Sequence, residues 1–242
     1  MLWSVNKLSG FRLRAADGDL GKPKDCFFDD FHWTIRYLVA DTGTWLSHRK
    51  VLVAPSAFAG INEAEQSLQL SISRKQVEDS PPIEADLPVS SRREQEYFQH
   101  FGWIWFGPPG AGEISYAPLM VPAAPEPAAS ERQGDPHLRS CREVAGYRIH
   151  TLDTHIGHVS DFLAEDGRWT IQYLVVDTGN WWPGKKVLVL PGWIERVSWK
   201  ATEVRLKVTA RTIQEAPEFD SSVPFTKEYE ERLARTYFGK SA

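Results

Sequence analysis

The stretch GKPKDCFFDDFHWTIRYLVADTGTWLSHRKVLVAP, residues 21–55, decides the fold because the chain contains it twice. Residues 157–191 read GHVSDFLAEDGRWTIQYLVVDTGNWWPGKKVLVLP, and 18 of the 35 aligned positions are identical without a gap. Such self-similarity at one fixed offset indicates an internal duplication. The chain is therefore expected to contain two copies of one small fold, 136 residues apart.

Each copy of the stretch contains two strand-like runs separated by a turn. Residues 33–40 (WTIRYLVA) and 50–54 (KVLVA) are rich in β-branched and aromatic side chains, which favour strands. The Asp-Thr-Gly sequence that follows the first run is typical of a turn, because Asp bonds nearby backbone and Gly tolerates positive φ. A hairpin is predicted in each copy. The motif residues expected to have structural roles are Trp33, Asp41, Gly43, Trp45, Trp169, Asp177, Gly179 and Trp181.

The similarity extends on both sides and gives units of about 100 residues. We place the first repeat at residues 1–106 and the second at 138–242. Residues 107–137 hold seven of the 16 prolines and are predicted to be a Pro/Ala-rich linker. Closely spaced short strands followed by one or two short helices in each copy predict an all-β fold with minor α content, as two small barrels. Copies this similar are expected to pack as a pseudo-symmetric pair.

Composition excludes several classes of protein. The net charge is −4 and the pI about 6.0, whereas nucleic-acid binding usually requires a basic excess, so no nucleic-acid partner is expected. No apolar run is long enough to span a membrane and no signal peptide is evident, so a cytoplasmic location is expected. Peripheral membrane association and oligomerisation are compatible with these features. Two distant cysteines predict neither a disulfide framework nor a zinc site, and no cofactor is predicted.

The repeated unit, G-x3-D … W-x-I-x-Y-L-V … D-T-G-x-W … K-V-L-V-x-P, resembles the PRC-barrel family. Residues 80–103, and more weakly 216–239, are similar to the tail of stand-alone bacterial PRC-barrel proteins. The family includes the cytoplasmic domain of the photosynthetic reaction-centre H subunit and the C-terminal domain of a ribosome-maturation factor. The resemblance implies two PRC-type barrels and a role in docking onto protein partners. It supplies no catalytic motif.

Two kinds of chemistry compete with that interpretation. Asp41 and Asp177 each lie in Asp-Thr-Gly, and two such motifs build the carboxylate dyad of aspartic proteases. Bulky residues follow both motifs and no flap is evident, which makes a hydrolase the remote alternative. Asp153, His155 and His158 carry metal-ligand chemistry, but their counterparts in the first copy do not repeat it. They are weak metal candidates, and no metal is predicted.

Copy-specific aromatic residues are the best candidates for partner contacts, because Trp and Tyr dominate interaction hot spots. We expect Trp103, Trp105, Trp182 and Trp193 to serve this role. The acidic pairs Asp29-Asp30 and Glu165-Asp166 are interpreted as solvated turn residues. The sequence thus predicts a non-enzymatic macromolecular-binding or assembly module with a protein partner, linked by resemblance to photosynthetic or other membrane complexes. The alternative is a small-ligand sensor with a pocket between the barrels.

Overall fold

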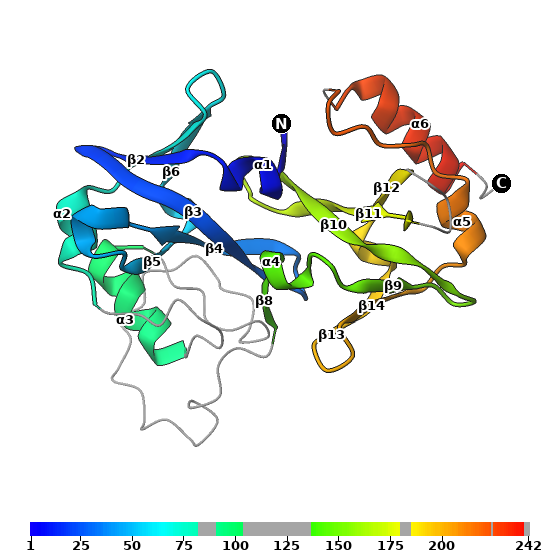
Figure 1. Ribbon diagram of the computed structural model, residues 1–242, viewed down its shortest axis with the longest axis horizontal. Coiled ribbons are helices and arrows are strands. Elements are labelled where there is room, and N and C mark those ends of the chain that lie inside the picture. Colours follow the sequence, from blue (N-terminus) through cyan, green and yellow to red (C-terminus); the bar gives the residue numbers. More distant parts are fainter. Residues whose placement is uncertain (82–90, 104–136, 180–184, 224, 240–242) are drawn as a thin grey trace, which may run out of the picture. The chain divides into compact units, whose positions relative to one another are not determined.

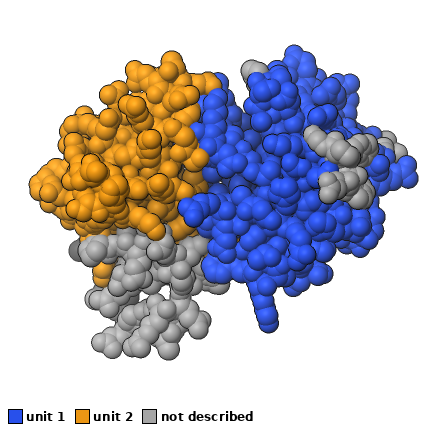
Figure 2. Space-filling view, viewed as in Figure 1, with its two compact units in different colours: residues 1–8, 33–35, 140–242 blue, residues 9–32, 36–139 orange. Residues whose placement is uncertain are grey.

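The computed structural model describes residues 1–81, 91–103, 137–179, 185–223 and 225–239, of which residues 91–95 are described by their backbone alone. The described chain is mostly β and contains two seven-stranded sheets (Figure 1). It divides into two compact units, shown in Figure 2. Unit 1 comprises residues 1–8, 33–35 and 140–242, and unit 2 comprises residues 9–32 and 36–139. The predicted linker lies outside the described residues, except for His137.

The sheet of unit 2 has the strand order β5-β4-β3-β2-β7-β6, and β8 pairs with β3 beside this path. The pairs β2–β3, β4–β5 and β6–β7 are antiparallel, and β2 and β7 run parallel. The strands are β2 (Arg12–Ala15), β3 (Gly18–Asp29), β4 (Thr34–Asp41), β5 (Lys50–Val53), β6 (Phe58–Asn62), β7 (Ser67–Leu70) and β8 (Leu138–Ser140). The expected hairpin of residues 33–54 is confirmed, with Asp41 opposite Lys50 at the end next to the connecting turn.

Two helices follow the sheet strands of unit 2, as predicted. The first, α2 (Arg74–Glu78), is capped by Ser73. The Ser73 side chain accepts a hydrogen bond from the Gln76 amide, and the Gln76 side chain accepts one from the Ser73 amide. This reciprocal capping satisfies backbone donors that a helix start leaves unpaired. The second, α3 (Ser91–Phe101), buries Tyr97. Tyr37 of β4 meets Phe98 edge to face, so α3 packs on this sheet through aromatic rings.

The sheet of unit 1 repeats this order as β12-β11-β10-β9-β14-β13, with β1 paired to β10. Its strands are β1 (Leu2–Ser4), β9 (Arg148–His150), β10 (His155–Glu165), β11 (Ile171–Asp177), β12 (Lys186–Val189), β13 (Ile194–Ser198) and β14 (Glu203–Leu206). Its helices are α1 (Val5–Ser9, which ends one residue into unit 2), α4 (Cys141–Val144), α5 (Ala210–Gln214) and α6 (Lys227–Phe238). Leu233 of α6 joins a core cluster with Leu163, Val175, Leu188 and Phe219.

The first strand of each repeat completes the sheet built by the other repeat. β1 pairs antiparallel with β10, with Leu2 opposite Glu165 and Ser4 opposite Leu163. β8, which occupies the position of β1 in the second repeat, pairs with β3. The compact units therefore differ from the predicted repeats of residues 1–106 and 138–242, because each unit contains a short segment from the other repeat.

The turn between β3 and β4 and the turn between β10 and β11 are joined by hydrogen bonds within unit 1. Trp33 and Trp169 occupy equivalent positions and share a left-handed backbone, with φ of 57° and 56°. The amide of Ile35 donates to the Trp169 carbonyl at 2.8 Å, and the amide of Ile171 donates to the Trp33 carbonyl at 2.6 Å. Both Trp side chains are buried.

The prediction of closed barrels is not met by the described strands. Each hydrogen-bonded path has two free ends, at β5 and β6 in unit 2 and at β12 and β13 in unit 1. A short 3-10 turn that begins with proline, Pro55–Ala57 or Pro191–Trp193, separates the two end strands. Proline lacks an amide donor, so the ladder ends there. Among the described helices, none is long and apolar enough to cross a membrane.

Candidate functional site

The repeated Asp-Thr-Gly motif forms a tight corner at the end of β4. Oδ1 of Asp41 accepts a hydrogen bond from the Gly43 amide at 2.8 Å, which closes an Asx turn. The Thr42 hydroxyl is buried and donates to the Arg49 carbonyl at 2.9 Å. Trp45 follows in a 3-10 turn, and its indole Nε1 donates to the Leu20 carbonyl at 2.8 Å. The motif thus fastens the turn to β3 through side chains as well as backbone.

The second copy repeats this corner at the end of β11. Oδ1 of Asp177 accepts from the Gly179 amide at 2.8 Å, and the Thr178 hydroxyl donates to the Lys185 carbonyl at 2.8 Å. Trp181, the counterpart of Trp45, lies outside the described residues. Asp41 and Asp177 thus close the same Asx turn through Gly43 and Gly179 in the two copies.

A histidine and a lysine lie close to the Asp41 carboxylate. Nδ1 of His48 lies 3.3 Å from Oδ1 of Asp41, and Nζ of Lys24 lies 3.8 Å from Oδ2. The hydrogen bond from the Gly43 amide is the main cause that lowers the pKa of Asp41, and His48 adds to it. The lowered pKa of Asp41 therefore follows mainly from the hydrogen bond that closes the turn.

The residues considered as weak metal ligands serve the fold in unit 1. Oδ1 of Asp153 accepts from the Ala210 amide at 2.9 Å, at the start of α5. This hydrogen bond is the main reason why the pKa of Asp153 is lowered. Asp17, its counterpart, accepts in the same way from the Arg74 amide of α2 at 2.7 Å. His155 packs edge to face against His150, and burial lowers the pKa of His155. Across the described residues, no group of three or more His, Cys, Asp or Glu is placed to hold a metal ion.

The copy-specific tryptophans that the structure describes pack inside their own units. Trp103 stacks on Phe101 of α3, with ring centroids 4.5 Å apart and an angle of 13° between the planes. Trp193 meets Tyr237 of α6 at 4.2 Å. Both rings are half-buried, so each has a packing role beside the partner contact predicted for it. Trp105 and Trp182 lie outside the described residues.

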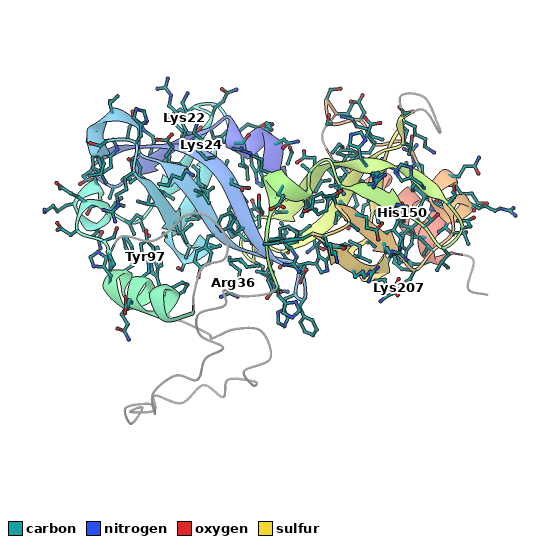
Figure 3. All side chains as sticks on the ribbon, turned by 60° about the horizontal axis from the view of Figure 1, so that its bottom comes forward. Lys22, Lys24, Arg36, Tyr97, His150 and Lys207 are labelled. Atoms are coloured by element: carbon teal, nitrogen blue, oxygen red, sulfur yellow. The ribbon has the colours of Figure 1, made fainter. Side chains whose placement is uncertain are left out.

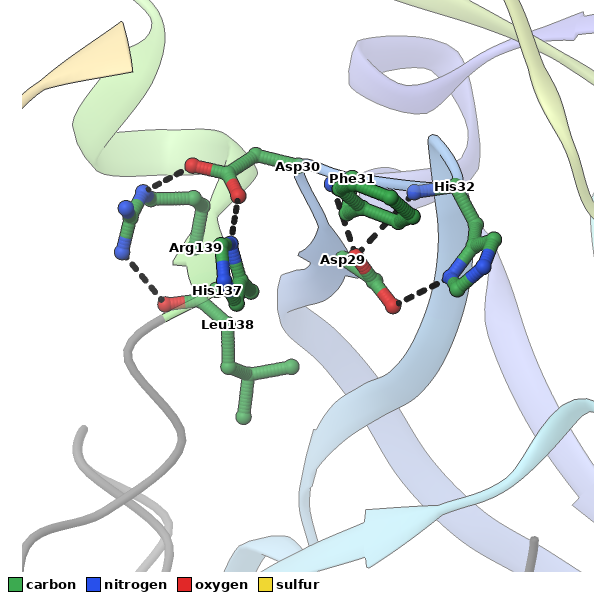
Figure 4. A network of polar contacts seen from close by, with 7 residues as sticks. All are labelled: Asp29, Asp30, Phe31, His32, His137, Leu138 and Arg139. Carbon is green, nitrogen blue, oxygen red and sulfur yellow. Dashed lines mark hydrogen bonds and ion pairs between the residues drawn. The ribbon is translucent and has the colours of Figure 1, made fainter. Parts of the chain in front are cut away.

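An exposed aromatic side chain that sequence reasoning missed lies in unit 2 at the end of β3 (Figure 4). Phe31 is 67% exposed and stands between two histidines, with ring centroids 4.8 Å from His32 and 6.0 Å from His137. We call Phe31, His32 and His137 the Phe31 patch. The signal in the sequence was that Gly167 occupies the equivalent position in the second copy, so the aromatic ring is specific to the first.

Two carboxylates hold the Phe31 patch in place. Asp29 is buried, contrary to its prediction as a solvated turn residue. Its Oδ1 accepts from the amides of Phe31 at 2.7 Å and His32 at 3.2 Å, and its Oδ2 lies 3.1 Å from Nδ1 of His32. Asp30 contacts Nδ1 of His137 at 2.9 Å. Hydrogen bonds thus fix the backbone at Phe31 (Figure 4), while its side chain is exposed.

Asp30 also anchors the incoming strand β8. Its Oδ2 lies 2.7 Å from Nε of Arg139, and its amide donates to the His137 carbonyl at 2.9 Å. Burial raises the pKa of Asp30, and the hydrogen bond from His137 and the charge of Arg139 oppose that rise.

Asp166, the counterpart of Asp30, holds strand β1 in unit 1 by corresponding contacts. Its amide donates to the Met1 carbonyl at 3.0 Å, and its Oδ2 accepts from the indole Nε1 of Trp3 at 3.2 Å. One repeated aspartate therefore fastens the exchanged strand in each unit.

Neither a scan against protein-family models nor a search of curated proteins finds a match to this chain.

Proposed function

We propose that this chain is a non-enzymatic binding or assembly module whose partner is a protein, and that the Phe31 patch is a contact surface for that partner. The proposal extends the sequence resemblance to PRC-barrel proteins. In this proposal each open sheet of the chain corresponds to a PRC-type barrel, and the two copies act as a pseudo-symmetric pair. The exchange of first strands between the repeats supports a pseudo-symmetric pair, because exchange of an identical element is a known route to homodimers. A link to photosynthetic or other membrane complexes, and a cytoplasmic location, stay predictions from sequence.

The observation that carries the proposal is the exposure of Phe31 on a fixed backbone. Leaving a large aromatic ring in water has no benefit for folding, because burial of apolar area is what stabilises the fold. Hydrogen bonds from two successive amides to Asp29 hold the backbone that bears the ring. A preorganised aromatic anchor loses little entropy on binding, which is why such residues dominate protein interfaces.

The repeated residues support a scaffold rather than a reaction. Asp41, Thr42 and their counterparts are engaged in turns and in bonds to backbone carbonyls. The hydrolase alternative predicts acid-optimal proteolysis that Asp41→Asn abolishes. We expect the purified chain to show no such activity in wild-type or variant form.

The test uses two matched positions. Phe31 and Leu152 are both 67% exposed, and they lie in different units. A photo-reactive amino acid is placed at residue 31 or 152 of the full chain, and cross-linked proteins are identified from native lysate of the source cells. We expect one saturable partner at residue 31, which unlabelled wild-type chain displaces. The same partner should bind Phe31→Ala about tenfold or more weakly and bind Leu152→Ala normally.

Two results would overturn the proposal. One is the same set of proteins cross-linked from both positions, which would show that residue 31 makes only nonspecific contacts. The other is a saturable partner whose affinity is unchanged in Phe31→Ala. In that case Trp105 and Trp182 would be the next predicted contacts to test.

A further inference from the structure

A groove of about 400 Å³ lies in unit 2 beside the Asp-Thr-Gly corner. Its size falls within the range of small-molecule sites, which begins at about 300 Å³. Six of its lining residues carry ionisable side chains from β2, β3, the end of β4 and the following turn. They are Arg12, Asp19, Lys22, Lys24, Asp41 and His48.

The cations of the groove point outward because of strand alternation. Arg12 is exposed while its neighbour Leu13 is buried, and Lys22 and Lys24 are exposed on either side of buried Pro23. Lys22 and Lys24 therefore project from the same face of β3, and Figure 3 shows them close together on unit 2. Arg12 belongs to β2, which pairs with β3 through Leu13 and Gly21, so all three cations stand on adjacent strands.

Both carboxylates of the groove already have partners. Asp19 lies 3.4 Å from Nε of Arg14, which is outside the groove lining. Asp41 is engaged by the Gly43 amide, by His48 and, at a longer distance, by Lys24. Within the described residues, neither Arg12 nor Lys22 forms an ion pair. The groove thus has two cations, Arg12 and Lys22, without an ion-pair partner among the described residues, and Lys24 lies 3.8 Å from Asp41.

We propose that this groove binds a small phosphate-bearing anion, with Arg12 and Lys22 as the main contacts and Lys24 as a third. A guanidinium offers two parallel donors that match phosphate oxygens, and an ammonium adds a compact charge. Three cations on adjacent strands fit a diphosphate better than a single carboxylate, because each phosphoryl group brings further charge and acceptor oxygens. This site is separate from the Phe31 patch and goes beyond the function proposed above.

The second copy supplies a variant that is compatible with the fold. His158 and Ser160 occupy the positions of Lys22 and Lys24, whereas Arg148 matches Arg12. The double variant Lys22→His/Lys24→Ser therefore installs side chains that an equivalent β-strand already accommodates. The matched control is Lys200→Ser/Lys207→Ser, which removes two exposed lysines from unit 1 and lowers the net charge equally when His is neutral.

Isothermal titration of the full chain with pyrophosphate and with ADP, at low salt and without divalent cations, tests the proposal. We expect one site per chain with a Kd of about 1 mM or tighter. The Lys22→His/Lys24→Ser variant should bind about tenfold or more weakly, and the control within about twofold of wild type. The amide NMR signals of Gly21 and Gly43, which line the groove, should shift on titration.

The two probes distinguish the source of the phosphate. Tighter binding of ADP would identify an organic phosphate, and equal binding would identify the free diphosphate group. The absence of saturable binding of either probe at about 5 mM would overturn the proposal. Equal weakening in the groove variant and the control would also overturn it, because it would show a general effect of net charge. Failure of this site would leave the Phe31 cross-linking result unaffected.

Discussion

Gly21 of β3 lies against the backbone carbonyl of Asp41, so that a Cβ atom at residue 21 would come within 1.9 Å of that oxygen. Gly157 has the same relationship to Asp177, at 2.0 Å. In each copy, the glycine that begins the repeated stretch therefore contacts the backbone of the aspartate in the Asp-Thr-Gly motif. This close approach places the Asp-Thr-Gly corner on β3 and brings Asp41 beside the cationic groove of unit 2.

Gly21→Ala is expected to destabilise unit 2 by about 3 kcal/mol or more, because the new methyl group meets fixed backbone atoms and the φ of +144° disfavours L residues. Gly60→Ala is the matched control, since Gly60 has a φ of +151° and nothing near its missing Cβ. The control should lose only about 1–2 kcal/mol from its backbone angle. Urea unfolding of both variants measures the difference, and equal losses would show that the contact with Asp41 is unimportant.

Thr42→Val should cost about 1–2 kcal/mol, because it removes the buried hydroxyl that donates to the Arg49 carbonyl at 2.9 Å. Val and Thr have similar shapes, so packing is retained. Thr178→Val should cost a similar amount through the Lys185 carbonyl. Thermal unfolding compares both with Thr44→Val at an exposed position of the same corner. A loss at Thr44 as large as that at Thr42 would mean that the hydroxyl bond contributes nothing specific.

Local sequence signals predicted the parts of the fold that depend on neighbouring residues. The hairpin of residues 33–54, the turn at Asp41 and the short helices after the strands of each copy all follow from short-range pattern and turn chemistry. The contact between Gly21 and Asp41 was also present in the sequence, as a glycine and an aspartate kept at the same spacing in both copies. It was missed because close backbone approach has no signal in hydrophobic periodicity.

The exchange of strands could not be predicted from local pattern. β1 and β8 have three residues each, too few for alternation to be recognised. The same residues would satisfy the sheet of either repeat, so the sequence of a duplicated chain leaves the pairing undecided. The Phe31 patch was missed for a related reason. Asp29 resembles a solvated turn residue until the β3–β4 turn folds its side chain under the two amides that follow.

Asp41→Asn should reduce stability at neutral pH by about 0.5–1 kcal/mol while keeping the Asx turn, since the Asn side-chain oxygen can also accept from Gly43. The hydrogen bond from Gly43 lowers the pKa of Asp41 below 3.8 in the folded chain. The ionised carboxylate therefore contributes stability above pH 3.8, and this contribution is lost as the pH falls through the lowered pKa. Melting temperatures of wild type and variant should converge in acid. A difference that stays constant with pH would assign the effect to packing and not to charge.

Trp3→Ala should destabilise unit 1, although Trp3 belongs to the first repeat. The Trp3 side chain is 6% exposed, its indole donates to Asp166, and its backbone pairs with Ala164 of β10. Loss of a buried tryptophan costs about 3–5 kcal/mol, which should accelerate the slowest amide exchange in β10 and β11 by about a hundredfold or more. Hydrogen exchange followed by mass spectrometry locates this effect along the chain.

Phe11→Ala is the control that makes the result specific. Phe11 is eight residues further along the same repeat and 2% exposed, but it belongs to unit 2. Its loss should accelerate exchange in β2, β3 and β7 and leave β10 protected. If both variants loosened the same strands, the chain would fold repeat by repeat and β1 would not complete the other sheet. Opposite patterns from two buried aromatics so close in sequence would show that the first repeat divides between two folding units near Leu8 and Ser9.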